Sequence, residues 1–486
     1  MVKNKQRINY MAYNSEDYFR SKDFKNILKQ YEEAEKHGTY AMLDSDELVD
    51  VAEYYYNNGN AQRASEIIEE ALSIYPGSAA PLLFKARLEL IEHNNVEQAE
   101  YFTEMIEDKS DLEYFYMKAE ILLAQGLVKQ ADAYLEERYS DVDDEDKDFY
   151  AIDVAALFID YDSVNEAEMW LAKSEDTESV EYKEQAARIF MERGDYEKSK
   201  ELFNNLIDND PFSTQYWNSL ASAQFFSNNI EESIQSSEYS IAINPQNATA
   251  LLNKANGLYN LGNYTEALKY YLRYSELCPT DENGEMLIGF CYLLLDKFEE
   301  STIHFEKAER LSAPQSPNLV DIYKDWAFAL CRLNRIDESM KIMDKTDHLS
   351  CDHNEMLVYR GNLLIGNGHF LEAKKYFMQA MKESGYSPNI FTKIAITVFE
   401  SGDNILAYKM FSMLFKSNKN WHDGYAYYAA CCYSLCKWDE FLNNLDKAAR
   451  YTPQDAKLVL GKLFPQNMDP KDYYQYMSDK IKNEDK

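Results

Sequence analysis

The chain has 486 residues, of which 84 are Asp or Glu and 50 are Lys or Arg, and its formal net charge is −34. Residues 51–200 carry 36 acidic and 14 basic side chains, so about two thirds of the excess negative charge lies in that stretch. A field of this sign repels phosphate backbones and anionic membrane surfaces, so the composition argues against nucleic-acid binding and favours a well-solvated surface.

The N-terminal residues contain no apolar segment of the kind found in a signal peptide. The longest apolar run, Leu287 to Leu295, is far shorter than the roughly 18 residues that a membrane span needs. All seven cysteines lie between Cys278 and Cys436, an odd count without framework spacing, which favours reduced thiols in a helical core. These features predict a cytoplasmic protein with no membrane insertion.

Residues 1–44 are predicted to form a polar tail followed by a degenerate or capping helix. The first 14 residues are polar. A helix is expected from about Glu16 to His37, with Phe24, Leu28 and Tyr31 on one face.

Pairs of short amphipathic helices are predicted from residue 45 onward. The first clear pair has Leu48 and Ala52 on one face of its first helix, and Gly59 is expected at the turn. The pattern is sharpest from Ala248 to Pro279, where the break at Gly262 and Asn263 separates two apolar stripes: Leu251, Ala255 and Leu258, then Ala267, Tyr271 and Tyr274.

This pattern recurs at about 34 residues, the signature of a helical solenoid. The second helices repeat a small residue at 34-residue spacing, interrupted once by a four-residue insertion: Ser199, Ser233, Ala267 and Ser301, then Ser339, Ala373 and Ala407, with Phe441 in the last unit. The first helices show the same spacing: Ala187, Ala221, Ala255, Gly289, Ala327, Gly361, Ala395 and Ala429.

Two helices approach closely only where both side chains are small, so these positions should mark the helix crossings. The pattern predicts about twelve repeats, irregular and acidic over residues 45–211 (repeats one to five), regular over 212–453 (repeats six to twelve), and closed by a half repeat and a capping helix over 454–486.

The residues at these positions resemble the tetratricopeptide repeat (TPR) family. Repeat six supplies Trp217, Leu220 and Ala221, and repeat seven supplies Ala267 and Tyr271, at the spacings of the family pattern. The resemblance covers about residues 45–453. It implies an all-α fold, a right-handed α-solenoid superhelix of about twelve helix-turn-helix repeats. Ser in place of Ala at four second-helix positions departs from the family pattern.

In TPR proteins the first helices line a concave face that binds protein or peptide segments. Carried onto this chain, the resemblance implies a peptide-binding groove in repeats six to twelve, with these candidate residues: Asn218, Phe225, Asn256, Tyr259, Met286, Phe290, Phe328, Asn362, Phe399 and Tyr433. Aromatic side chains would anchor a peptide and amides would bind its backbone. The alternative is that these aromatics pack between repeats. Leu252 and Val358 stand where lysines would complete a carboxylate clamp, so binding of chaperone tails is not predicted.

Three clusters of possible metal-binding or redox residues are better explained as ordinary loops or core residues. His348, Cys351 and His353 lie within six residues, but zinc sites need a fourth ligand and paired spacing, so an ordinary loop is favoured. The acidic run 141–148 lacks the glycine and closing glutamate of a calcium loop. Cys431, Cys432 and Cys436 are expected in one helix, with Cys432 and Cys436 sharing a buried face.

The sequence contains no GxGxxG, phosphate-loop or GxSxG motif. It therefore predicts no enzyme, no cofactor and no metal. The favoured function is a non-enzymatic scaffold whose partners are other proteins or peptide segments. The alternative is a peptide-responsive receptor resembling bacterial TPR proteins that sense signalling peptides, and metal binding is the weaker third possibility.

Overall fold

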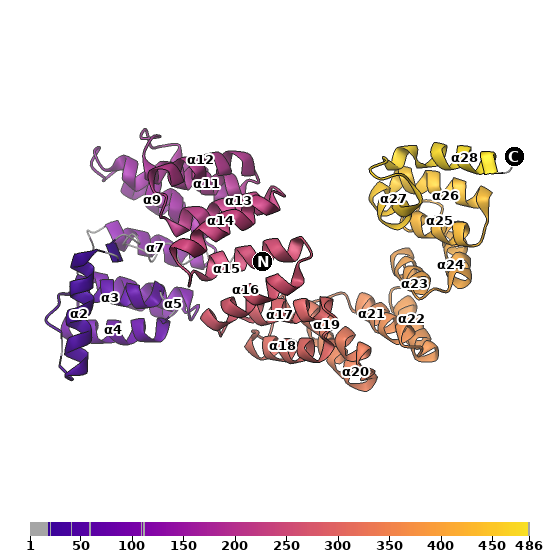
Figure 1. The fold of residues 1–486 in the computed structure, drawn as a ribbon. Helices are drawn as coiled ribbons and strands as arrows, with labels where there is room; N and C mark the ends of the chain where they lie inside the picture. The colour runs from indigo at the N-terminus through magenta and orange to yellow at the C-terminus, as the bar shows by residue number, and fades with distance from the viewer. Residues whose placement is uncertain are drawn as a thin grey trace. The chain divides into compact units, whose positions relative to one another are not determined.

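The computed structural model describes residues 18–19, 21–39, 41–57, 60–107, 109 and 112–484. Across these residues the chain is built from 27 α-helices and contains no strand, which confirms the predicted all-α repeat fold (Figure 1). The predicted polar tail of residues 1–14, the residue Glu16 and the turn residue Gly59 lie outside the described residues.

The chain divides into two compact units, residues 1–279 and 280–486. In unit 1 the helices are α2 (Lys22–Lys36), α3 (Ser45–Asn57), α4 (Ala61–Ile74), α5 (Ala79–Ile91), α6 (Val96–Glu104), α7 (Leu112–Ala124), α8 (Val128–Tyr139), α9 (Lys147–Asp160), α10 (Val164–Leu171), α11 (Val180–Glu192), α12 (Tyr196–Asn209), α13 (Thr214–Phe226), α14 (Ile230–Ile243), α15 (Ala248–Asn260) and α16 (Tyr264–Leu277).

In unit 2 they are α17 (Glu282–Leu294), α18 (Phe298–Leu311), α19 (Leu319–Arg332), α20 (Ile336–Asp344), α21 (His353–Gly366), α22 (Phe370–Glu383), α23 (Pro388–Glu400), α24 (Asn404–Ser417), α25 (Tyr425–Ser434), α26 (Trp438–Tyr451), α27 (Pro453–Leu460) and α28 (Tyr473–Glu484). The division after Pro279 falls at the end of a predicted repeat. The predicted boundaries after residues 44, 211 and 453 stay predictions.

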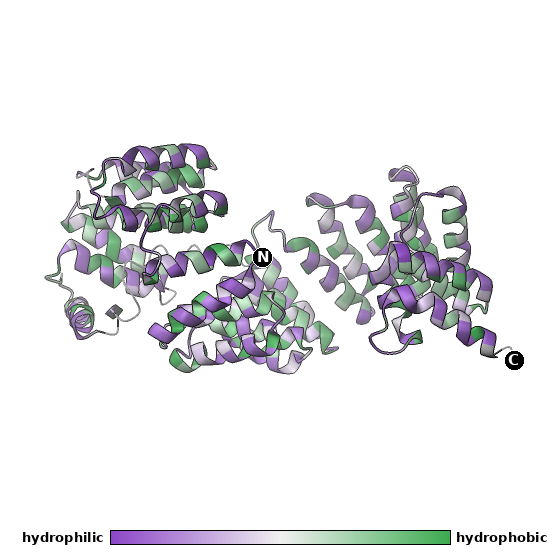
Figure 2. Cartoon of the chain, turned by 90° about the horizontal axis from the view of Figure 1, so that it is seen from above, coloured by the Kyte–Doolittle hydropathy of each residue, from purple (hydrophilic) through white to green (hydrophobic). Residues whose placement is uncertain are grey.

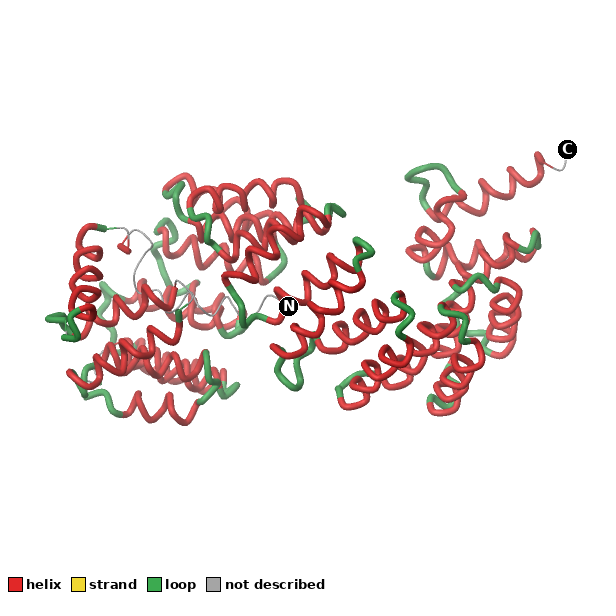
Figure 3. The backbone as a smooth tube through the Cα atoms, turned by 60° about the horizontal axis from the view of Figure 1, so that its bottom comes forward, coloured by secondary structure: helices red, strands yellow, loops and turns green. Residues whose placement is uncertain are grey.

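Helices α3 to α26 form twelve successive helix-turn-helix pairs, with α2 before them and α27 and α28 after them. Short loops join the two helices of each pair (Figure 3), and individual helices carry both hydrophobic and hydrophilic faces (Figure 2). The four-residue insertion predicted in repeat nine coincides with the longer connection between α18 and α19.

In eleven of the twelve pairs the turn is built around one residue with a left-handed backbone, and the turn of the first pair lies outside the described residues. Glycine adopts this conformation without steric cost, but Asn, Asp and one Cys also occupy it here: Asn94, Gly126, Asp162, Gly194, Asn228, Gly262, Asp296, Asn334, Gly368, Gly402 and Cys436. In several pairs the next residue caps the second helix, as Asn263 does by accepting a hydrogen bond from the backbone N–H of Glu266. The prediction that Cys436 shares a buried helical face with Cys432 is wrong, because α25 ends at Ser434 and Cys436 is an exposed turn residue.

The predicted small residues meet where the two helices of a pair cross. A Cβ atom built on Gly289 would lie 2.7 Å from Cε1 of Phe305, and one on Gly361 would overlap the ring of Phe377, so these rings occupy the space that glycine leaves. The four serines that depart from the family pattern are buried, and each hydroxyl donates to the carbonyl of the small residue 12 positions earlier: Ser199 to Ala187 at 3.0 Å, Ser233 to Ala221 at 2.7 Å, Ser301 to Gly289 at 2.9 Å and Ser339 to Ala327 at 2.8 Å. Serine therefore adds a hydrogen bond at a crossing that still accommodates only a small side chain.

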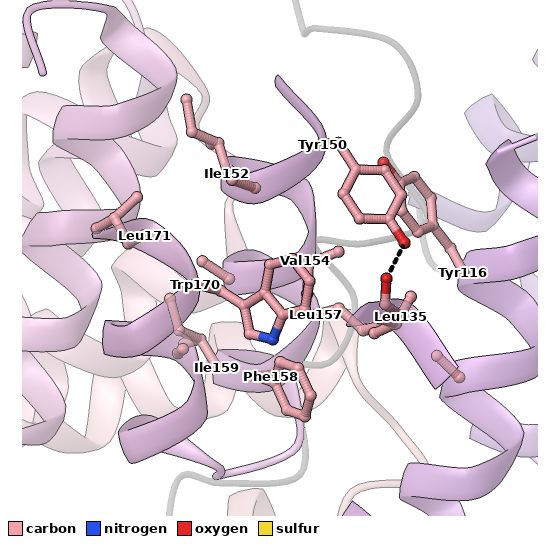
Figure 4. Close-up of a cluster of buried hydrophobic side chains, with 14 of the residues drawn as sticks. Tyr116, Leu135, Tyr150, Ile152, Val154, Leu157, Phe158, Ile159, Trp170 and Leu171 are labelled. Carbon is pink, nitrogen blue, oxygen red and sulfur yellow. Dashed lines mark hydrogen bonds between the residues drawn. The ribbon is translucent and has the colours of Figure 1, made fainter. Parts of the chain in front are cut away.

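Two of the irregular repeats, the second and the fourth, have short second helices. Helices α6 and α10 have 9 and 8 residues, whereas most second helices in the regular part have 14. A large core between α7 and α10 compensates for the lost length. In it the fully buried rings of Tyr150 and Trp170 lie 6.0 Å apart, and the Tyr150 hydroxyl donates to the carbonyl of Leu135 at 3.1 Å (Figure 4).

Gly361→Ala should destabilise unit 2 by about 1–3 kcal/mol, because the added methyl group overlaps the packed ring of Phe377. Gly366→Ala in the same helix is the matched control, since a Cβ there meets no atom within 4 Å. Urea unfolding followed by circular dichroism measures both. Equal stabilities for the two variants would contradict the proposed crossing.

Candidate functional site

All ten candidate groove residues lie on first helices. Unit 1 contributes Asn218 and Phe225 on α13 and Asn256 and Tyr259 on α15. Unit 2 contributes Met286 and Phe290 on α17, Phe328 on α19, Asn362 on α21, Phe399 on α23 and Tyr433 on α25. The period of the sequence thus places these residues on equivalent helices, while their accessibility differs from one to the next.

Met286 does not belong to an accessible surface. Its side chain is only 7% exposed and packs into a core that contains Trp326 and Phe305. The prediction that it lines a binding groove is therefore wrong in this structure, because the bulky residues of the neighbouring repeat cover it.

Phe290, Phe399 and Tyr433 are half-buried and use part of their rings for packing. Phe290 meets Phe305 edge-on with ring centroids 5.4 Å apart, and Tyr433 meets Phe441 at 5.3 Å, in both cases within one repeat. Phe399 meets Tyr427 of the next repeat at 5.7 Å. These rings therefore help to stabilise the repeats, and of the three Phe399 packs between repeats as the alternative interpretation expects, while each ring stays partly exposed.

The asparagines of unit 1 are engaged in internal hydrogen bonds. The Tyr271 hydroxyl donates to Oδ1 of Asn256 at 2.7 Å. Nδ2 of Asn218 donates to Oδ1 of Asn247 at 3.1 Å, and the carbonyl of Asn218 accepts from Nδ2 of Asn253 at 3.2 Å. These amides hold neighbouring helices together, so they are less suited to bind a peptide backbone than the sequence pattern suggested.

Two predicted residues, Phe328 on α19 and Asn362 on α21, share a surface with Asp325 and Tyr359, two residues that were not predicted. We call Asp325, Phe328, Tyr359 and Asn362 the α19–α21 surface. The Tyr359 hydroxyl donates to the carbonyl of Lys324 at 3.1 Å, which fixes the two helices side by side. Because residues three apart share a helix face, Asp325 lies beside Phe328 and Tyr359 lies beside Asn362.

The side chains of this surface are available for contact. Phe328 is 37% exposed, and among the described residues its ring has no aromatic partner. Asn362 is half-buried, and its amide makes no hydrogen bond with any residue that the structure describes. The surface therefore combines an apolar anchor with an unused amide.

Burial raises the pKa of Asp325 to about 6, with repulsion from Asp321 acting in the same direction and Lys324 opposing it. The pKa of Tyr359 is also raised, mainly by burial and then by the charge of Asp325. The sequence pattern missed Asp325 and Tyr359, because their burial depends on the helix of the neighbouring repeat.

A second feature that sequence reasoning missed is a line of charged residues in unit 1. The residue that follows the small crossing residue of each first helix is Asn256, Phe290, Phe328 or Asn362 in four of the regular repeats. In the preceding repeats the residue after the small first-helix residue is Ser222, Arg188, Ala156, Glu120, Arg87 and Glu53, so four of these six positions are charged. Extending the period into the irregular repeats would have found it.

Arg87 of α5 and Glu120 of α7 form a buried ion pair between neighbouring repeats. Nε of Arg87 lies 3.1 Å from Oε2 of Glu120, and both side chains are almost fully buried. Nη2 of Arg87 also lies 2.9 Å from Oε2 of Glu113. Burial raises the pKa of Glu120, while Arg87 opposes that shift.

The polar contacts continue along the first helices of unit 1. Arg188 on α11 pairs with Asp160 on α9. Glu184 on α11 accepts hydrogen bonds from Nε2 of Gln215 at 2.7 Å and from the Tyr216 hydroxyl at 3.3 Å, both on α13. Ion pairs and hydrogen bonds thus link the first helices of unit 1, whereas aromatic rings predominate on the first helices of unit 2.

The loop that contains His348, Cys351 and His353, for which the sequence favours an ordinary loop over a metal site, does not gather these residues around one point. Nδ1 of His353 lies 3.4 Å from Asp347 and its Nε2 lies 3.4 Å from Glu383, while Sγ of Cys351 donates to the carbonyl of Thr346 at 3.5 Å. Within the described ranges, no group of three or more His, Cys, Asp or Glu residues is arranged to hold a metal ion.

Burial raises the pKa of the Cys291 and Cys431 thiols to about 12 and that of Cys432 to about 11. These thiols therefore stay protonated near neutral pH and are weak nucleophiles. In the part of the chain that the structure describes, no helix has the length and apolar character of a membrane span.

The family model described as Tetratricopeptide repeat matches residues 185–236 and 227–282. The chain is 25% identical over 172 residues to Protein O-mannosyl-transferase TMTC3 of Mus musculus and, equally, to the same protein of Homo sapiens. Each match covers 33% of this chain and 19% of the relative, so the chain spans less than two thirds of the length of the curated relatives it matches.

Solved structures of helical repeat proteins are similar to this chain at low identity. MamA 41-end from Desulfovibrio magneticus RS-1 is 14% identical, with a TM-score of 0.33 over 35% of this chain and 93% of that chain. The chain matched in the crystal structure of the APC/C hetero-tetramer Cut9-Hcn1 is 14% identical, with a TM-score of 0.40 over 82% of this chain and 76% of that chain.

Arg87→Met should destabilise unit 1 by about 3–5 kcal/mol, because it leaves the buried carboxylate of Glu120 without its guanidinium partner. The double variant Arg87→Met with Glu120→Met should recover most of that loss, since it removes the buried charge as well. Urea unfolding followed by circular dichroism gives both values. A double variant as unstable as the single one would show that lost packing, and not the unpaired charge, is responsible.

Asp325→Asn should stabilise the fold at pH 7 by on the order of 1 kcal/mol. The folded-state pKa of about 6 lies above the ordinary value of 3.8, so the charged carboxylate is disfavoured in the folded state. This group's contribution to stability therefore falls as pH rises from about 4 to 6, and the advantage of the variant should shrink between pH 7 and pH 5.

Urea midpoints measured across that pH range test this expectation, with Asp423→Asn, an exposed carboxylate in a loop of the same unit that does not act on Asp325, as the control. A constant difference between Asp325→Asn and the parent at every pH would rule out the raised pKa as its cause.

Proposed function

We propose that this chain, which matches the tetratricopeptide repeat model over residues 185–282, is a non-enzymatic cytoplasmic scaffold that binds segments of other proteins on its first helices. The observation that carries the proposal is the α19–α21 surface. There Phe328 of α19 is exposed and Asn362 of α21 has an amide that makes no hydrogen bond with any described residue, and the hydrogen bond from Tyr359 to the carbonyl of Lys324 joins the two helices.

The chemistry of this surface suits an extended or helical peptide segment. Phe328 offers an aromatic anchor, a residue type enriched among the contacts that dominate binding energy. Asn362 has both a donor and an acceptor to offer a peptide bond. Asp325 adds a carboxylate whose raised pKa gives its charge a pH dependence close to pH 6, so a basic side chain on the segment would bind more tightly at higher pH.

We infer binding without catalysis from the chemistry of the candidate nucleophiles. Burial keeps the Cys291, Cys431 and Cys432 thiols protonated. The transferase activity in the name of the TMTC3 relatives is not part of the proposal, because the match covers only 19% of those proteins.

Site-specific photo-cross-linking tests this function in the native cell. The photoreactive residue p-benzoylphenylalanine replaces Phe328 in one protein and Ile303 in another; Ile303 is 62% exposed on the second helix α18 of the same unit. Protein adducts from position 328, without matching adducts from position 303, would place the binding surface on the first helices.

For the partner so identified, Phe328→Ala should weaken binding by about ten-fold or more, as expected on loss of an aromatic anchor. Circular dichroism checks that the variant remains folded, which its exposure predicts. Adducts of equal yield from both positions, or an unchanged affinity for Phe328→Ala, would refute a first-helix binding surface.

A further inference from the structure

The outer face of α22 and α24 carries aliphatic side chains that stand in solvent. Five of them are exposed by 45–81%: Leu371, Met378, Ile405, Leu406 and Met413. The two helices belong to successive repeats and share a core, because Met410 of α24 packs against the cluster that contains Phe377 and Ala380 of α22. We call this face the α22–α24 patch. Exposed aliphatic residues gathered on adjacent helices commonly mark an interaction site.

Six lysines surround these aliphatic residues, and all six are exposed: Lys374, Lys375, Lys382, Lys409, Lys416 and Lys419. Within the described residues none of them has an ion pair or lies over an aromatic ring. The nearby acids on α22 have other partners, since Glu372 pairs with His369 at 2.8 Å and Glu383 accepts from Gln379 at 3.0 Å. Six lysines without partners are unexpected in a chain with 84 acids and 50 bases.

The patch repeats the period of the solenoid. Leu371, Lys375 and Lys382 on α22 correspond, at a spacing of 34 residues, to Ile405, Lys409 and Lys416 on α24. The next repeat has Asp439, Asn443 and Arg450 at the equivalent positions. The next repeat therefore lacks the combination of one aliphatic residue and two lysines, and the patch does not continue onto it.

The net charge of the whole chain differs from that of unit 2, which contains the α22–α24 patch. Residues 280–486 carry 25 basic and 30 acidic side chains, whereas residues 1–279 carry 25 and 54. At physiological ionic strength charges farther away than about 8 Å are largely screened, so the local lysines determine what approaches the patch. A ligand that docks here meets a positive, partly apolar surface.

We propose that the α22–α24 patch docks the chain on the surface of an anionic lipid bilayer. Lysines attract the negative headgroups of such a leaflet, and aliphatic tips enter the boundary between headgroups and acyl chains. The side chains among the lysines are Leu, Ile and Met, which suit acyl chains but cannot stack on bases, so the patch fits a lipid surface better than a nucleic acid. Docking on one outer face leaves the α19–α21 surface free for a protein partner.

Flotation of the full-length protein with vesicles tests the proposal. At about 0.15 M salt, the protein should bind phosphatidylcholine vesicles that contain about 30% phosphatidylserine and should ignore vesicles of phosphatidylcholine alone. The variant Lys375→Glu with Lys409→Glu should bind at least about ten-fold more weakly, because each basic group near an anionic leaflet contributes a several-fold factor. Lys462→Glu with Lys480→Glu, which makes the same charge change at exposed lysines outside the patch, should bind like the parent.

A second pair of variants separates lipid insertion from simple attraction. Leu371→Ser with Ile405→Ser should also weaken binding, whereas Leu458→Ser, a 77% exposed residue on α27, should not. Circular dichroism confirms that each variant is folded. A parent that ignores both kinds of vesicle, or patch and control variants that bind equally, would overturn the proposal. So would salt-sensitive self-association that only the Lys375→Glu and Lys409→Glu variant loses, because the occupant would then be a second copy of the chain.

Discussion

The close crossing of two helices within each repeat is the constraint on which the rest of the structure depends. Helices of 8 to 15 residues are marginal on their own and require tertiary packing. Ala, Gly or Ser at the crossing, which only the last repeat replaces on its second helix with Phe441, brings the two backbones near enough for an aromatic ring such as Phe305 or Phe377 to fill the space beside them. The serine crossings add a buried hydrogen bond to a first-helix carbonyl that already belongs to a helix, and this explains why Ser and Ala alternate without changing the fold.

The crossing fixes the rotation of the first helix about its axis. It therefore also fixes the direction of the residue that follows the small crossing residue on that helix. That residue is Arg87 or Glu120 in unit 1 and Phe290, Phe328 or Asn362 in unit 2. The same backbone position thus serves a buried ion pair in one unit and a partly exposed aromatic or amide surface in the other. A buried pair such as Arg87 and Glu120 adds little net stability, since desolvation offsets the attraction between the charges. It does penalise any register in which one of the two charges would be buried alone.

The sequence could predict the helix pairs and their crossings, because small residues at a fixed period have one simple explanation. It could not predict which candidate residues are accessible. Met286 satisfies the pattern as well as Phe328 does, yet it is buried, because its exposure is decided by Trp326 and its neighbours in the following repeat. Asp325 and Tyr359 escaped notice for the same reason: burial by a neighbouring helix, which no local pattern encodes, raises the pKa of both groups. Cys436 was misplaced because it occupies the left-handed turn position after α25, and a cysteine there carries no turn signal of the kind that glycine gives at Gly262.

Side chains on the outer faces of the second helices take no part in the helix crossings or in the core. Their residue types are therefore informative about requirements other than folding. A residue such as Lys375 or Leu371 touches no crossing, no ion pair and no core cluster, so folding alone does not require it to be a lysine or a leucine. In a chain whose acids outnumber its bases, an exposed position would on average favour an acid or a paired base. The repetition of one aliphatic residue and two unpaired lysines in two successive repeats therefore has no origin in the packing of the solenoid. Binding to another surface accounts for the repetition better. Lysines together with aliphatic side chains suit a binding surface that is negatively charged on the outside and apolar below, as an anionic lipid bilayer is.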